Sequence, residues 1–162
     1  MDEKIRIRNR ELTQLYKWED DLYSRYSIYC GLSDPAMWVL YTLYEATLDP
    51  GNEKQYTQNE LVSTWYYPKQ TINYAVMGLS KKGFVTLEQR PGSGNSKTIL
   101  LTPEGTKFCT DKILPLMQAE EHSFSRMTEE EQELLLQLSR KKCAYLDEEI
   151  RQITGDTTTT KL

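Results

Sequence analysis

The chain has few of the residues that metal sites, disulfide frameworks and membrane spans require. It contains one histidine and three cysteines among 162 residues. One histidine excludes a two-histidine metal site within a chain, and three scattered cysteines fit reduced thiols better than paired ones. No run of about 18 apolar residues is present, so we expect no membrane-spanning helix. The charged N-terminus lacks the apolar stretch of a signal peptide, which favours a cytoplasmic protein, and we expect no metal or cofactor.

Charge is distributed unevenly along the chain. The formal net charge is −4. Residues 57–101 contain five basic and two acidic residues, a local excess of +3, so the remainder carries −7. A basic segment on an acidic body can bind phosphates in one orientation while the rest is repelled. This pattern predicts salt-sensitive binding to double-stranded DNA.

Residues 57–101 show, in order, the features of a winged helix-turn-helix. The segment opens with Thr57-Gln58-Asn59-Glu60, which has the pattern of a capping box. In this motif the Thr57 side chain can bond the backbone amide of Glu60, and the Glu60 side chain can bond the backbone amide of Thr57. After a short helix, Tyr66 and Tyr67 lead into Pro68, which disfavours helix at Tyr67 and suits the first turn of a new helix. Two helices joined by a tight turn are therefore expected.

The second of these helices is expected to have one apolar and one polar face. A narrow apolar stripe at i, i+3, i+4 and i+7 spacing is formed by Ile72, Ala75, Val76 and Leu79. Side chains on the far side donate and accept hydrogen bonds, as the reading of base edges requires. The candidate DNA contacts in and before this helix are Thr57, Lys69, Gln70, Thr71, Asn73 and Tyr74.

A β-hairpin is expected to follow. Gly83 ends the second helix, and residues 84–88 and 97–101 alternate as two strands. The Gly-rich residues between them predict a flexible loop. This loop has the composition of a phosphate-binding loop, but it lacks the Gly-Lys-Ser/Thr ending and precedes a strand rather than a helix. We therefore do not predict an enzyme.

Helices are also expected on both sides of this segment. Residues 3–29 contain no Gly or Pro and carry apolar residues at three- and four-residue steps, up to Gly31. Ser33 is expected to cap the next helix. Beyond the hairpin, Thr102 and Thr128 are expected to cap two more, and Pro115 predicts a kink or break inside the first of these.

The flanking helices predict a dimer. Their apolar stripes are too extensive for a domain of this size to cover. The predicted fold is therefore mainly α with a small β-hairpin: a winged-helix core at residues 33–101, helical dimerisation regions at residues 3–31 and 103–152, and a disordered Thr-rich tail at residues 154–162. A monomeric helical bundle is the alternative.

Short segments along the chain carry a family resemblance. They are Leu32-Ser33, Val39-Leu40 with Leu43, Thr57-Gln58-Asn59-Glu60-Leu61, Lys69-Gln70-Thr71-Ile72-Asn73, Leu79-Ser80-Lys81-Lys82-Gly83-Phe84-Val85, Ser96-Lys97, Leu101-Thr102-Pro103-Glu104-Gly105 and Met127-Thr128-Glu129-Glu130-Glu131-Gln132. Over nearly all of residues 3–152 the chain resembles the MarR family of bacterial winged helix-turn-helix transcription regulators. The resemblance implies a homodimer joined through its terminal helices, a recognition helix at residues 68–82 and a wing at residues 84–101.

The wing departs from the family pattern. The family's wing usually carries an Asp-x-Arg-like element before the Ser-Lys pair, and its arginine enters the minor groove. Here those positions read Ser93-Gly94-Asn95. Arg90 and Lys97 are left as the candidate wing cations, and Asn95 can read the minor groove without bringing charge.

Ligand sensing is a further expectation. Members of the family often bind small aromatic or phenolic effectors between the dimer frame and the DNA-binding lobe. The residues that could line such a crevice are Tyr16, Tyr23, Tyr26, Tyr29 and Trp38. The same rings could instead pack the dimer core, and the sequence leaves both readings open.

The predicted function is thus a sequence-specific DNA-binding transcription regulator, a homodimer on a pseudo-palindromic operator that a small aromatic effector releases. One alternative is a winged helix that binds protein through the polar face of residues 68–82. The other is a thiol-based redox sensor acting through Cys30. A redox role needs a depressed thiol pKa, but Cys30 falls near a helix end whose dipole opposes the thiolate.

Overall fold

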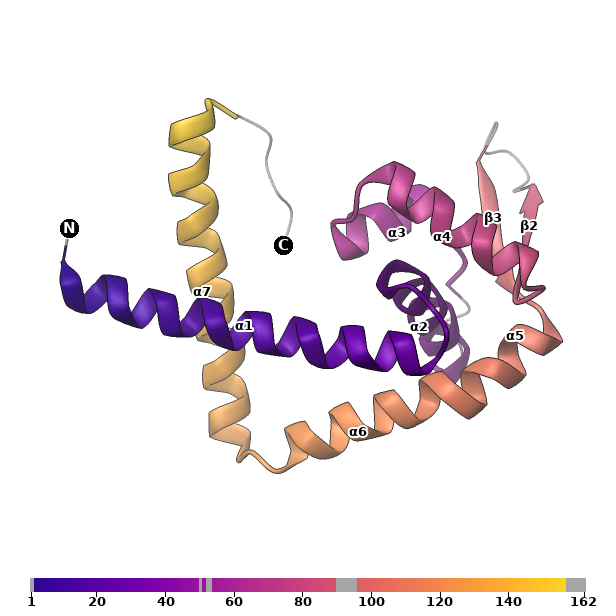
Figure 1. Cartoon of the computed structure of the whole chain (residues 1–162), viewed down its shortest axis with the longest axis horizontal. Helices are drawn as coiled ribbons and strands as arrows, with labels where there is room; N and C mark the ends of the chain where they lie inside the picture. The colour runs from indigo at the N-terminus through magenta and orange to yellow at the C-terminus, as the bar shows by residue number, and fades with distance from the viewer. Residues whose placement is uncertain (1, 50, 52–53, 90–95, 157–162) are drawn as a thin grey trace. The chain divides into compact units, whose positions relative to one another are not determined.

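The structure is a computed structural model that describes residues 2–49, 51, 54–89 and 96–156. Helices dominate it (Figure 1). In chain order the elements are α1 (Glu3–Tyr29), α2 (Asp34–Leu48), β1 (Tyr56–Thr57), α3 (Gln58–Trp65), α4 (Lys69–Lys81), β2 (Val85–Gln89), β3 (Lys97–Leu101), α5 (Pro103–Phe108), the π-helical turn η1 (Cys109–Ile113), α6 (Leu114–Ser125) and α7 (Glu129–Thr154). The mainly helical class with a small hairpin is confirmed.

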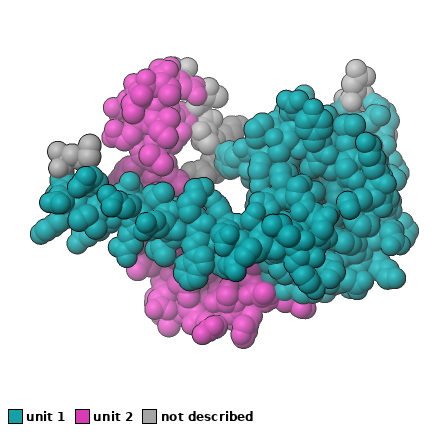
Figure 2. All heavy atoms as spheres, in the orientation of Figure 1, with its two compact units in different colours: residues 1–116 teal, residues 117–162 magenta. Residues whose placement is uncertain are grey.

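The chain divides into two compact units, Met1–Leu116 and Met117–Leu162 (Figure 2). The first unit contains α1 together with the helix-turn-helix and the sheet. The assignment of residues 3–31 and 103–152 to dimerisation stays a prediction. No helix in the described part of the chain is long and apolar enough to cross a membrane.

A three-stranded antiparallel sheet contains one strand that the sequence did not predict. The strand order is β1-β3-β2, and β2 and β3 form the expected hairpin. The additional strand, β1, pairs Tyr56 with Ile99 and Thr57 with Thr98. A strand of two residues is too short for an alternating pattern to be recognised in the sequence.

The core of the first unit is built around α2. Met37, Val39 and Leu40 of this helix are fully buried. Side chains from four other elements are equally buried, namely Leu61, Ile72, Leu79, Ile99 and Ile113. The apolar stripe predicted for α4 faces inward as expected. Figure 1 shows α3, α4 and the β2–β3 hairpin close together, in agreement with their contacts.

Glycines end α1 and α4 as predicted. Gly31 and Gly83 adopt left-handed conformations, with φ of 67° and 76°. After each glycine the chain makes a Schellman pair of hydrogen bonds, for example from the Leu32 amide to the Ser27 carbonyl at 2.9 Å. At the start of α2, Ser33 occupies the N-cap position, but its side chain makes no capping hydrogen bond.

Pro115 does not break the helix that follows the hairpin. Instead, α5 continues through η1 into α6, and the Leu114 amide bonds the carbonyl of Cys109, five residues back. Proline has no amide hydrogen for the carbonyl four residues before it. The sequence predicted a kink or break at Pro115, and the structure instead has a wider π-helical turn just before it.

The C-terminal helix is longer than expected at its end. The Thr128–Glu131 capping box opens α7, which runs to Thr154 and ends at Gly155 with φ of 69°. The predicted tail at residues 154–162 is therefore wrong at its start, because Thr154 still belongs to the helix. Residues 157–162 lie outside the described residues.

Candidate nucleic-acid interface

The start of α3 is fixed by the predicted capping box. The hydroxyl of Thr57 accepts a hydrogen bond from the Glu60 amide at 3.3 Å. The Glu60 carboxylate in turn accepts two hydrogen bonds from Thr57, one from its hydroxyl at 2.8 Å and one from its amide at 2.7 Å. Thr57 is only 7% exposed. The prediction that its side chain contacts DNA is therefore corrected: burial and both hydrogen bonds commit this hydroxyl to the helix start.

The turn between α3 and α4 contains a strained residue. Tyr66 has φ of 56° and ψ of 21°, and it is the one non-glycine with positive φ among the described residues. This left-handed conformation costs a residue with a side chain about 1–2 kcal/mol. Its amide bonds the Val62 carbonyl at 2.9 Å, and its ring is 67% exposed. From the sequence, Tyr66 was predicted only as part of a turn and not as a candidate contact, because a tyrosine gives no sign in the sequence of a positive φ.

The outer face of α4 is polar and accessible. Lys69, Gln70 and Tyr74 are exposed, and Thr71 and Asn73 are half-buried beside them. The Gln70 side-chain amide donates to the Tyr74 hydroxyl at 3.1 Å, so two predicted contacts one turn apart are already joined. This pair orients an amide and a phenol outward from the helix, where both can still bond base edges.

Met77 is a further exposed side chain on α4, at 45%. An apolar group at this position suits contact with a thymine methyl. Lys81 and Lys82 are exposed at the end of the helix. Met77 was not predicted as a contact from the sequence, because its thioether has no hydrogen-bonding group suited to reading base edges.

The wing is described only at its base. Gln89 of β2 pairs with Lys97 of β3, and the Lys97 side chain is exposed. Arg90 and Asn95, the other predicted wing contacts, lie outside the described residues. Lys97 is therefore the wing cation that the structure positions.

The five aromatic residues predicted for one crevice do not come together. Tyr23 and Trp38 line a cavity of 690 Å³, but Tyr16, Tyr26 and Tyr29 are not among its lining residues. At about 100° per residue, Tyr23 lies roughly 20°, Tyr26 roughly 80° and Tyr29 roughly 140° from Tyr16 around α1. This cavity therefore contains two of the five predicted residues, and an effector role for the other three stays a prediction.

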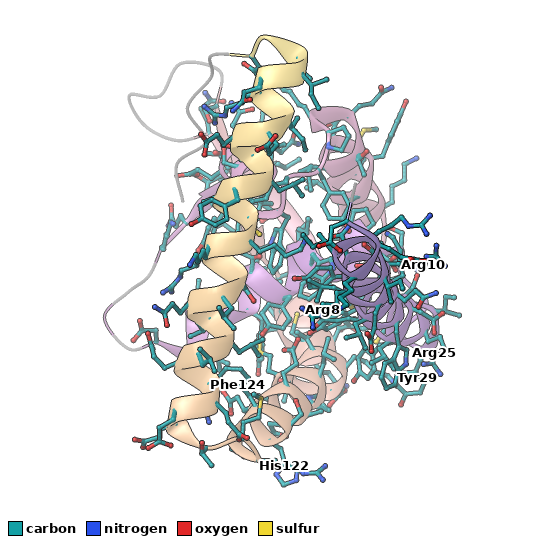
Figure 3. All side chains as sticks on the ribbon, turned by 90° about the vertical axis from the view of Figure 1, so that its left-hand side faces the viewer. Arg8, Arg10, Arg25, Tyr29, His122 and Phe124 are labelled. Atoms are coloured by element: carbon teal, nitrogen blue, oxygen red, sulfur yellow. The ribbon has the colours of Figure 1, made fainter. Side chains whose placement is uncertain are left out.

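Tyr26 and Tyr29 contact Lys112 of η1 instead. The Tyr26 hydroxyl donates to the Lys112 carbonyl at 2.8 Å. The Lys112 ammonium lies 4.2 Å from the centre of the Tyr29 ring and donates to its hydroxyl at 3.0 Å. Figure 3, viewed roughly along α1, shows Tyr29 extending outward from this helix, of which it is the last residue. These two tyrosines attach α1 to η1.

Neither buried cysteine has the properties of a thiolate sensor. Burial raises the pKa of the Cys30 thiol, although nearby Lys112 lowers it in part. Burial also raises the pKa of Cys109 to about 12. A redox sensor needs a lowered thiol pKa, so the Cys30 alternative is not supported.

The described residues contain no group of three or more side chains suited to hold a metal ion. His122 is exposed and extends outward from α6 (Figure 3).

Comparison with known proteins places the fold. No family model and no curated protein sequence matches the chain. Among solved structures, a MarR family regulator from Neisseria meningitidis aligns with a TM-score of 0.73 and 16% identity, over 88% of this chain and 96% of that one. A MarR family regulator from Streptomyces coelicolor, solved in complex with DNA, aligns with a TM-score of 0.69 and 19% identity, over 88% of both chains. NadR, solved with 4-hydroxyphenylacetate, aligns with a TM-score of 0.64 and 15% identity, over 82% and 89%. The chain therefore has the winged helix-turn-helix fold of the MarR family of transcriptional regulators.

Proposed function

We propose that the chain is a sequence-specific regulator that binds double-stranded DNA through α4 and the wing. The observation that carries this proposal is the outer face of α4, where the joined Gln70–Tyr74 pair stands beside Asn73, opposite a fully buried stripe. Exposed lysines at both ends of α4 and at the base of the wing supply positive charge for phosphates. A solved protein of the same fold is bound to DNA.

The proposed active form is a homodimer. α7, which the structure describes in full, has no buried residue. Its large exposed apolar side chains are Leu134, Leu135, Leu136, Leu138, Tyr145, Leu146, Ile150 and Ile153. With about 3.6 residues per turn, all of these except Leu136 fall on one half of the helix. α1 likewise exposes Ile5, Leu15 and Trp18. A second copy of the chain would cover these faces in an interface of about 2,000 Å² or more.

The proposed operator is pseudo-palindromic. Two-fold related α4 helices would enter successive major grooves, with half-sites about one helical turn, roughly 10 bp, apart. A small aromatic effector would release the DNA. The cavity lined by Tyr23 and Trp38 supports this step, and a protein of the same fold was solved with an aromatic ligand.

The test is fluorescence anisotropy with the DNA upstream of the chain's own gene and a random duplex of equal length. Saturable binding to the first, tighter than to the second by about a thousandfold or more, is expected of a specific regulator. Equal binding to both would exclude sequence reading. Binding to neither would favour the protein-interaction alternative.

Asn73→Ala is expected to weaken binding to the cognate duplex by about 1–3 kcal/mol and to flatten base preference at one position per half-site, because base-edge hydrogen bonds are lost. Binding titrations on single-base variants of the duplex measure both effects. Asn9→Ala, an exposed change on α1, is the control. An equal loss on cognate and random DNA would show that Asn73 only positions the backbone.

Lys97→Ala is expected to weaken binding to all duplexes alike. Each lost phosphate contact should reduce the slope of log affinity against log salt by about 0.9. Affinities measured at several salt concentrations give this slope, and Lys107→Ala, an exposed lysine on α5, is the matched control. An unchanged slope for Lys97→Ala would show that the base of the wing does not touch phosphate.

A further inference from the structure

A cavity in the first unit has a lining unlike that of the α4 face. It has a volume of 690 Å³ and is lined by residues of α1, the first half of α2, the end of α3 and the turn that follows. This volume lies within the range of small-molecule sites. Its lining consists of four carboxylates, four aromatic rings and the hydroxyl of Ser24, and no lysine or arginine is among the described residues that line it. The four carboxylates are Glu19, Asp20, Asp21 and Asp34.

Two of the carboxylates have cationic neighbours on α1. Asp20 pairs with Lys17 at 2.8 Å and Asp21 with Arg25 at 3.0 Å. The side chains of both pairs are at least 60% exposed. Such exposed ion pairs contribute little to the free energy of folding. They balance the charges of Asp20 and Asp21 but leave the cavity open to a ligand.

The other two carboxylates have no cationic partner. Asp34 accepts a hydrogen bond from the neutral hydroxyl of Ser24 at 2.9 Å. None of the described residues forms a hydrogen bond or ion pair with Glu19. The cavity therefore has two uncompensated negative charges, one contributed by α1 and one by the start of α2.

The aromatic rings form a contiguous and fixed set. The Trp38 ring lies 4.9 Å from that of Tyr23 and 4.4 Å from that of Trp65, measured between ring centres. The Trp65 indole donates to the Thr42 hydroxyl at 2.6 Å, which fixes its orientation. Trp38 and Trp65 are only half-buried although they pack on each other, so part of each ring remains accessible from the cavity.

Tyr67 also lines this cavity. Its pKa is raised, first by burial and then by the negative charges of Asp34 and Asp20. A neutral phenol therefore lies beside the carboxylates.

We propose that this cavity binds an organic cation, a protonated amine or quaternary ammonium that carries an apolar group. Aromatic faces attract such cations, and Glu19 and Asp34 provide the opposite charge. The same carboxylates repel an anion. The ligand class thus differs from the phenolic acids that an aromatic lining alone would suggest.

The consequence for DNA rests on the function proposed above. Trp65 ends α3 and Tyr67 belongs to the turn before α4. A ligand held against both would bias the position of α4, provided that it binds the free and DNA-bound forms with different affinity. Binding of the cation itself requires no DNA, and it is tested without DNA.

The experiment is isothermal titration calorimetry of the full chain with benzyltrimethylammonium. We expect saturable binding of one cation per chain that weakens as salt is raised. The anionic probe 4-hydroxyphenylacetate is expected to give no saturable heat at the same concentrations. Absence of saturable binding by the cation, or equally tight binding of the anion, would overturn the proposal.

Two variants locate the site. Glu19→Gln and Asp34→Asn should each weaken cation binding by about tenfold, since each removes one charge near the ligand. Glu11→Gln and Glu45→Gln, exposed acids on the same two helices outside the lining, should leave it unchanged. Thermal melting shows whether each variant is folded. If Asp34→Asn is destabilised, Glu19→Gln, which changes an exposed side chain, tests the proposal by itself. Unchanged binding in Glu19→Gln, or equal losses in the controls, would contradict the assignment. Failure of DNA binding would overturn the proposed function and leave this result standing.

Discussion

Leu138→Glu is expected to convert the proposed dimer into monomers at micromolar concentration. Leu138 is 52% exposed on the apolar half of α7, where the second copy would cover it. Losing a buried leucine costs about 1.5–3 kcal/mol, and two-fold symmetry doubles this to about 3–6 kcal/mol per dimer. This corresponds to a loss of roughly a hundredfold to ten-thousandfold in dimer affinity. Burying the new carboxylate in the interface would weaken the dimer further. Sedimentation velocity measures the change.

Leu136→Glu is the matched control for this prediction. Leu136 lies on the same helix and is 40% exposed, but it is on the other half of the circumference. The Leu136→Glu variant should remain dimeric. A folded wild-type monomer at micromolar concentration, or dimers of unchanged affinity in Leu138→Glu, would exclude α7 as the interface.

Gly105→Ala is expected to destabilise the first unit by about 3 kcal/mol or more. Gly105 is buried in α5, and a Cβ atom there would overlap the backbone carbonyl oxygen of Phe84. That oxygen is held by the Thr102 amide at 3.0 Å, and the Thr102 hydroxyl bonds the Gly83 carbonyl at 2.6 Å. No side-chain rotation can relieve an overlap between Cβ and backbone. Urea unfolding followed by circular dichroism gives the change.

Gly78→Ala is the control for the effect of an added methyl group. Gly78 lies inside α4, and a Cβ there meets no atom within 4 Å. Alanine in a helix interior should stabilise by about 0.5–1 kcal/mol relative to glycine. Equal stability of Gly105→Ala and the wild type would show that α5 does not pack closely against the residue before β2.

The elements that were predictable from the sequence carry local signals. Thr57 and Thr128 each start a helix because the partner side chain is three residues away. Gly31 and Gly83 end helices because the left-handed conformation favours glycine. The buried face of α4 follows from spacing alone. In each case the interacting residues are within one or two helical turns.

The features that were missed depend on contacts between distant segments. Which tyrosines of α1 meet Trp38 and which meet Lys112 depends on how α2 and η1 pack against it. The acidic cavity combines side chains from three helices and a turn, and no spacing links Glu19 to Trp65. The left-handed conformation of Tyr66 is likewise set by the turn between two packed helices.

The measurement that tests the central claim most directly is selection of bound duplexes from a random-sequence pool, followed by sequencing. A dimer that reads DNA through two α4 helices should enrich inverted repeats with half-sites about 10 bp apart. The Asn73→Ala variant should lose preference at one position of each repeat. Enrichment of no sequence, or of single sites without an inverted repeat, would contradict the proposal that paired α4 helices read the operator.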